Sequence, residues 1–195
     1  DLISKKYKNF SNINKIKIYS VDEIQKSLNK NEAMIYLINE FFHQAFVITK
    51  NEFHLISDYS IGRERTKKVM DLNRKNIIDE IDSRLTQNIN ALFFNTYFKE
   101  VYKKIKNKDK LIFVADKYYS NFPFDTMVIN NPEMNTNNID KIDHNIKPRY
   151  LVQDFEISYL PNIETFVQVS SNNKINISKN SKFLGIGDPI LKLRS

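Results

Sequence analysis

The sequence contains no cysteine, no tryptophan, only three glycines and only three histidines among its 195 residues. Without cysteine, these residues can form no disulfide, no thiolate metal site and no cysteine nucleophile, and the chain suits a reducing compartment such as the cytoplasm. No apolar run approaches the roughly 20 residues that span a bilayer, and the first residues carry no signal-peptide pattern. We therefore expect a cytoplasmic localisation and no membrane partner.

Length and composition favour one globular domain. A chain of this size can bury about 70% of its unfolded surface, and 41% hydrophobic with 12% aromatic residues is ordinary for such a domain. The net charge is +7, from 30 basic and 23 acidic residues. Because the two signs are mixed along the sequence, they favour an ordinary solvated surface, and a nucleic acid is the less favoured partner.

Apolar periodicity divides the chain into alternating strands and helices. Strand patterns cover residues 33–38, 45–49, 53–56, 111–115, 156–160 and 183–187, and the second and third of these form a hairpin. Helical spacing covers residues 21–28, 63–81, 87–106 and 163–169. This alternation predicts an α/β fold, in which a mixed sheet is flanked by helices and has an antiparallel hairpin near the start.

Two longer segments have helical spacing of apolar residues. In residues 63–81 the expected stripe consists of Val69, Leu72, Ile77 and Ile81. In residues 87–106 it consists of Leu92, Phe93, Val101, Tyr102 and Ile105. Tyr97 and Tyr102 lie close to the second stripe, so we expect them to pack in the core rather than stack on nucleic acid bases.

Helix starts are marked by polar side chains at two positions. Ser20 followed by Glu23 has the capping-box pattern. Asn162 is expected to cap the helix over residues 163–169. Between these helices, an asparagine-rich stretch at residues 130–147 predicts a long loop.

Residues 111–128 combine a strand, an acidic turn and a return to the core. The run 111–115 is continuously apolar, as in a strand that is covered on both faces. Asp116 ends it, and Pro123 restricts the backbone before the chain turns inward again. We interpret Asp116 and Asp125 as turn and packing positions.

The three histidines do not predict a metal site. A hairpin turn at residues 50–51 places His54 opposite Val47, and His43 then lies on the same face about 13 Å further along the strand. His144 lies in the asparagine-rich loop, near two aspartates. We therefore expect no metal and no other cofactor.

Other chemistry-bearing patterns are weak. No nucleophile elbow surrounds Ser60, and none of the three histidines has a neighbour that suggests a catalytic base, which disfavours acyl transfer. The glycines of residues 183–187 follow a strand, as in a dinucleotide-binding turn, but Asp188 comes next and would repel phosphate. Asp188 either borders a ligand site at the carboxyl end of this strand or, with Pro189, merely ends it.

Three phrases along the chain are together similar to one family. Residues 111–128 read LIFVADKYYSNFPFDTMV, residues 150–166 read YLVQDFEISYLPNIETF, and residues 183–191 read FLGIGDPIL. Their order, after a strand and a hairpin, resembles the CHAT domain, a caspase-like domain often found after tetratricopeptide repeats. The likeness covers about residues 32–191.

The resemblance implies the amino-terminal, non-catalytic half of a CHAT-domain cysteine endopeptidase. Residues 1–30 would be a linker or the tail of an upstream repeat region, residues 31–181 the non-catalytic subdomain, and residues 182–195 the first strand of a truncated catalytic subdomain. In the family, the catalytic His and Cys follow that strand in an H-x-x-x-H-G and an S-A-C phrase. Neither phrase occurs here, so no catalytic residue is assigned, and this fragment is expected to be inactive alone.

The implied partners are a protein substrate or regulatory repeats of the same polypeptide. Asp188 would then be a candidate for the substrate pocket, where an acidic group favours a basic side chain. Three alternatives stay open: a non-enzymatic interaction scaffold, a basic nucleic-acid-binding adaptor and an unrelated α/β domain. A sheet without residues 111–115 beside residues 183–187 would favour the last of these.

Overall fold

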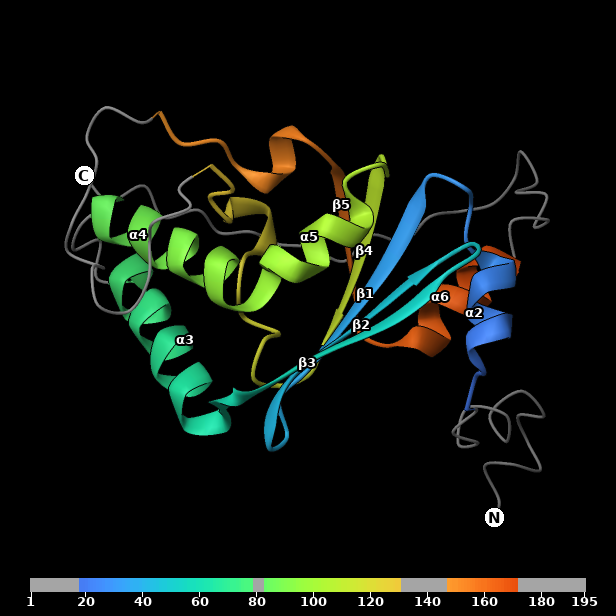
Figure 1. The fold of residues 1–195 in the computed structure, drawn as a ribbon, viewed down its shortest axis with the longest axis horizontal. Helices are drawn as coiled ribbons and strands as arrows, with labels where there is room; N and C mark the ends of the chain where they lie inside the picture. The colour runs from blue at the N-terminus through green and yellow to red at the C-terminus, as the bar shows by residue number, and fades with distance from the viewer. Residues whose placement is uncertain (1–17, 79–82, 131–146, 172–195) are drawn as a thin grey trace, which may run out of the picture.

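A mixed five-stranded sheet forms the centre of the molecule (Figure 1). This computed structural model describes residues 18–78, 83–130 and 147–171. The strands are β1 (Glu32–Ile38), β2 (Phe42–Thr49), β3 (Phe53–Gly62), β4 (Lys110–Ala115) and β5 (Glu156–Leu160). Their order in the sheet is β3-β2-β1-β4-β5, with β1, β4 and β5 parallel and β2 antiparallel to both of its neighbours. The predicted α/β class, with its early hairpin, is confirmed.

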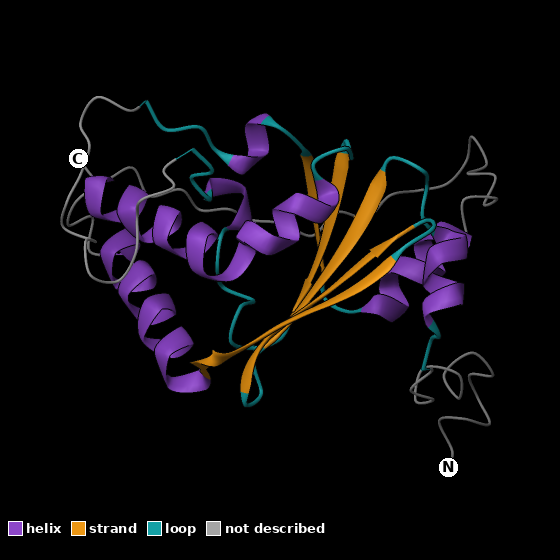
Figure 2. Ribbon diagram, viewed as in Figure 1, coloured by secondary structure: helices purple, strands orange, loops and turns teal. Residues whose placement is uncertain are grey.

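Helices cover both faces of this sheet (Figure 2). One face carries α2 (Val21–Ser27) and α6 (Ile163–Ser171), and the other carries α3 (Arg63–Ile78), α4 (Ser83–Phe93) and α5 (Lys99–Ile105). A π-helical segment, η2 (Phe94–Phe98), joins α4 to α5. Two 3-10 turns, η3 (Phe124–Thr126) and η4 (Leu151–Gln153), lie between β4 and β5 in sequence. Among these described helices, none is long and apolar enough to cross a membrane.

The hairpin of β2 and β3 has the predicted register. The Thr49 amide donates to the Glu52 carbonyl at 2.9 Å across the turn, and Val47 lies opposite His54. The expected caps are present as well. Ser20 and Glu23 form both halves of a capping box at the start of α2.

β4 lies inside the sheet, as its continuous apolar run predicts, and its four middle residues are buried. Its two neighbours are β1 and β5, both parallel to it. Residues 183–187 lie outside the described residues. The pairing expected between them and residues 111–115 therefore stays a prediction.

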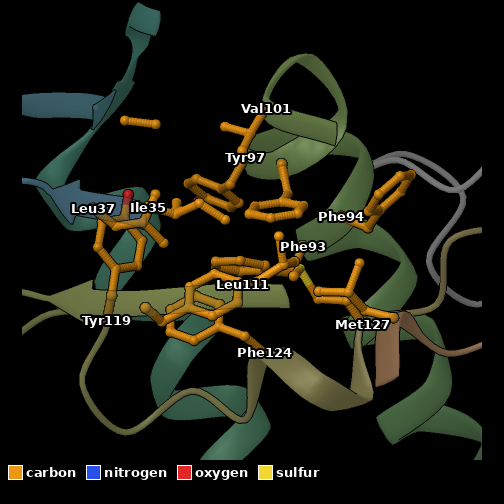
Figure 3. Packing of buried hydrophobic residues seen from close by; sticks show 14 of the residues in the cluster. Ile35, Leu37, Phe93, Phe94, Tyr97, Val101, Leu111, Tyr119, Phe124 and Met127 are labelled. Carbon is orange, nitrogen blue, oxygen red and sulfur yellow. The ribbon is translucent and has the colours of Figure 1, made fainter. Parts of the chain in front are cut away.

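Two hydrophobic cores lie on opposite faces of the sheet. The larger core, between the sheet and the α3–α5 layer, is dominated by stacked aromatic rings (Figure 3). In it, the ring centroids of Phe113 and Phe124 are 4.4 Å apart, and those of Phe93 and Phe122 are 3.9 Å apart. The smaller core lies under α2 and α6 and includes buried Ile24 and Leu28. The helix α2 is therefore part of the packed fold, although it precedes the domain boundary predicted at residue 30.

The expected apolar stripe of α3 is wrong in part. Leu72 and Ile77 are 41% and 47% exposed, whereas Thr66, Asn73 and Asn76 are buried. The buried amides face α4, where Asn73 Nδ2 donates to Asn90 Oδ1 at 2.8 Å. Because each buried amide has a partner on the facing helix, a polar interface forms where the sequence predicts an apolar one. Ile81 lies outside the described residues.

Candidate functional site

The carboxyl ends of the three parallel strands meet at one edge of the sheet. Asn39 follows β1, Asp116 follows β4 and Pro161 follows β5. In open α/β sheets, ligands bind beyond this edge. We therefore regard it as the candidate functional site.

Asp116 ties the ends of β1 and β4 together. Its Oδ2 accepts the backbone amide of Asn39 at 2.6 Å, and its Oδ1 accepts the amides of Tyr118 and Tyr119 at 2.8 and 3.3 Å. The Asp116 amide in turn donates to the Leu37 carbonyl at 3.0 Å. Two of these three bonds to the carboxylate lie within the turn after β4, which confirms the interpretation of Asp116 as a turn position.

Beside this turn lies a buried polar network that joins four segments of the chain. Tyr119 Oη lies 2.7 Å from His43 Nδ1 and 3.2 Å from Asn39 Nδ2. The same Asn39 amide also donates to Thr66 Oγ1. Thr66 Oγ1 lies 3.4 Å from the hydroxyl of Tyr97, which comes from the π-helical segment. All five side chains are at most 3% exposed.

Tyr119 Oη accepts a hydrogen bond from the Asn39 amide and shares a second one with His43 Nδ1. The tautomer of the neutral imidazole sets which of the two groups donates in that second bond. Neither His43 Nε2 nor Asn39 Oδ1 has a hydrogen-bond partner of standard geometry among the described residues.

Burial keeps the His43 imidazole and the Tyr119 phenol uncharged. Desolvation lowers the pKa of His43 to about 4, against smaller opposing effects of a Tyr97 backbone contact and the charges of Asp58 and Asp116. Desolvation also raises the pKa of Tyr119. At neutral pH the pair is a buried, uncharged hydrogen bond that no substrate can reach. The network holds strands and helices in place rather than transferring protons.

A hollow of about 550 Å³ opens on the other side of Asp116, between the strand ends and the start of α6. Its lining includes Asp116, Glu164 and Tyr36, and no basic side chain among the described residues. The pKa of Tyr36 is raised by burial first and then by the negative charges of Asp116 and Glu40. This acidic character disfavours phosphate and other anions there.

The remaining candidates from the sequence do not gather at this edge. Asp188, His144 and the glycines of residues 183–187 lie outside the described residues. His54 pairs with Glu52 at 3.1 Å on the hairpin, apart from His43. Ser60 donates to Asp58 Oδ1 at 2.6 Å and has no histidine beside it among the described contacts. No group of three His, Asp or Glu side chains suited to a metal ion occurs in the described parts of the chain.

The side chains considered for nucleic acid binding have other roles. Tyr97 is buried, and Tyr102 packs against the large core while its hydroxyl donates to Asp154 at 3.0 Å. In the lysine-rich stretch, Lys103 pairs with Glu100 and Lys110 pairs with Glu156. The expected core packing of the two tyrosines is confirmed.

Comparison with known proteins gives no identification. No family model matches the sequence. No curated protein matches it either. The resemblance to the CHAT family therefore stays a prediction from the sequence.

Proposed function

We propose that this chain is the amino-terminal, non-catalytic part of a CHAT-domain cysteine peptidase, with a structural and regulatory role. The support is the position of the resembling phrases in the sheet. Asp116 follows β4 and Pro161 follows β5, so two phrases reach the same carboxyl edge of parallel strands. Active sites in α/β sheets are built at that edge.

In this proposal, the described residues carry the sheet and later residues carry the chemistry. His43 is buried and neutral, so it cannot serve as the base. A histidine beyond Ser195 would take the proton of a cysteine thiol, and the thiolate would attack the peptide carbonyl carbon. The C–N bond then breaks as the amine takes that proton, and water hydrolyses the thioester. Upstream repeats would regulate the reaction by shifting the elements at this edge.

The proposal is tested by extending the reading frame past Ser195. We expect an H-x-x-x-H-G phrase followed by an S-A-C phrase, and hydrolysis of a quenched fluorescent peptide library by the intact protein. Changing the S-A-C cysteine to Ala should abolish hydrolysis and leave the thermal unfolding midpoint unchanged. Absence of both phrases would overturn the peptidase proposal.

A non-enzymatic interaction scaffold is the second candidate. It is favoured by the lack of an accessible nucleophile beside a histidine in the described parts of the chain. An intact protein without hydrolysis, in which both phrases are missing, would favour this function. Binding to nucleic acid that weakens steeply with salt would instead favour the adaptor.

A further inference from the structure

Three neighbouring hollows lie in a row along α3 and share lining residues. The first, of about 180 Å³, and the second, of about 270 Å³, share Asn73, Arg74 and Asn121. The second and the third, of about 500 Å³, share Ile77. This row of hollows, called the groove below, lies between α3 and the segment that follows β4, and its last hollow reaches Val152 in η4.

One end of the groove is basic. Lys67, Arg74 and Lys117 line it, with Asp71 as the acidic residue among them. Within the described residues, none of the three cations forms an ion pair. Lys117 instead lies 5.1 Å from the ring centroid of Tyr118, which also lines this end. Unpaired cations around a hollow favour an acidic ligand.

The other end is apolar. Ile77 and Val152 line it and are 47% and 52% exposed. Two of its polar side chains already bond to each other, since Asn90 Nδ2 donates to Thr126 Oγ1 at 2.9 Å. The carboxylate at this end, Asp125, accepts a hydrogen bond from Tyr159 Oη at 2.6 Å. What this end offers a ligand is therefore apolar surface, and contiguous exposed apolar surface marks interaction sites.

We propose that this groove binds a peptide segment of a partner protein, with acidic residues at one end and a large apolar side chain at the other. The distance along α3 from Lys67 to Ile77 is ten residues, or about 15 Å. A segment of that length reaches both ends at once. A nucleic acid would use the cations but would leave the apolar end unfilled. The inference is independent of any peptidase activity.

The test begins with a displayed library of random peptides, each about 12 residues long to cover the groove. Selection against the intact chain should enrich peptides with Asp or Glu on one side of a Leu, Ile, Met or Phe. Affinity of an enriched peptide is then measured by fluorescence anisotropy. Lys67→Glu with Arg74→Glu, and separately Ile77→Asp, should each weaken binding at least about 10-fold.

The same helix offers matched controls. Lys68→Glu with Lys75→Glu makes the same change of charge, and Leu72→Asp introduces the same side chain at a similarly exposed position. Neither control changes a residue that lines the groove, so both should bind the peptide normally. A peptide with Lys in place of its acidic residues should bind the Lys67→Glu, Arg74→Glu variant better than the original chain.

The proposal would be overturned by no enrichment of peptides, by equal loss of binding in the control variants, or by enrichment of basic peptides. It would also be overturned if peptides were enriched only after residues 131–146 were replaced by Gly and Ser. The last result would mean that the chain itself occupies the groove. A single-stranded RNA that binds through Lys67 and Arg74 and is insensitive to Ile77→Asp would assign the groove to nucleic acid. Circular dichroism of each variant checks that it folds.

Discussion

His43 is a base that the fold keeps neutral. It is 2% exposed, and its hydrogen bond to Tyr119 joins residues 76 positions apart in the sequence. A positive charge at that position would lose its hydration without gaining a carboxylate in contact. The pair therefore contributes to stability only while the imidazole is unprotonated.

This burial predicts that stability falls on mild acidification. The unfolded chain binds a proton at His43 below its ordinary pKa of about 6.5, whereas the folded chain binds it only below about 4. Between these values the unfolded state holds more protons, so the free energy of unfolding decreases as the pH falls. We expect a loss of roughly 3 kcal/mol from pH 6.5 to 4, measured by urea unfolding at a series of pH values.

The variant His43→Gln is the control for this prediction. It removes the titrating group, so the slope of stability between pH 6.5 and 4 should flatten. Asp58 also titrates, but its pKa is lowered, mainly by its hydrogen bond with Ser60, so its effect lies at lower pH. An unchanged slope in His43→Gln would contradict the assignment of the effect to His43.

Sequence reasoning separates His43 from His54 correctly, because hairpin register follows from a local turn. It could not find the partner of His43. Tyr119 reaches it only after β1 and β4 pair and after Asp116 folds the turn behind β4. No spacing or local composition encodes such a contact, so the sequence alone does not predict the network at the candidate site.

At the scale of elements, α3 turns a polar side chain inward and an apolar one outward. Asn73 is 3% exposed and bonded to Asn90, while Leu72 beside it in the sequence is 41% exposed. Helical periodicity predicts the bounds of this helix well, because the period follows from backbone geometry. Helical periodicity does not predict which residues of α3 are buried, because a buried amide is stable only when the facing helix supplies its hydrogen-bond partner.

We therefore predict that Asn73→Ala destabilises the protein more than Leu72→Ala. The first change leaves the buried Asn90 Oδ1 without its donor, which costs about 1–3 kcal/mol. The second removes a side chain that is substantially exposed and should cost less than about 1 kcal/mol. Chemical denaturation of the two variants measures the difference. A larger loss in Leu72→Ala would mean that the apolar stripe, rather than the amide pair, holds α3 in place.

The long helix after α3 shows a second limit of local patterns. The sequence predicts one helix over residues 87–106, and the structure places α4, η2 and α5 end to end across that range. The π-helical segment brings Tyr97 to the buried network, where its hydroxyl lies beside Thr66. Such a widened turn depends on the packing of its side chains, so apolar spacing gives no sign of it.

At the scale of the whole molecule, β1 and β4 are among the strands that connect the two cores. Leu111 and Phe113 of β4 point into the large core, whereas Ile112 and Val114 point into the small one. β1 alternates in the same way, with Met34 in the small core. Because successive residues of a strand face opposite sides of the sheet, unfolding of β1 or β4 removes packed side chains from both cores at once. The described fold should therefore unfold as one unit.

This shared sheet predicts that damage to the small core is felt in the large one. Ile112→Ala removes a 3% exposed side chain beneath α2 and α6 and should cost about 2–5 kcal/mol. Far-ultraviolet circular dichroism follows the backbone, and near-ultraviolet circular dichroism follows packed tyrosines such as Tyr97 and Tyr119. The urea unfolding curves from these two measurements should coincide, and Ile112→Ala should shift both by the same amount.

Leu55→Ala is the control for this prediction. It changes a 50% exposed position on the hairpin and should shift both curves only slightly. A near-ultraviolet curve that keeps its original midpoint in Ile112→Ala would mean that the two cores unfold independently, and that the sheet does not couple the candidate site to α2 and α6.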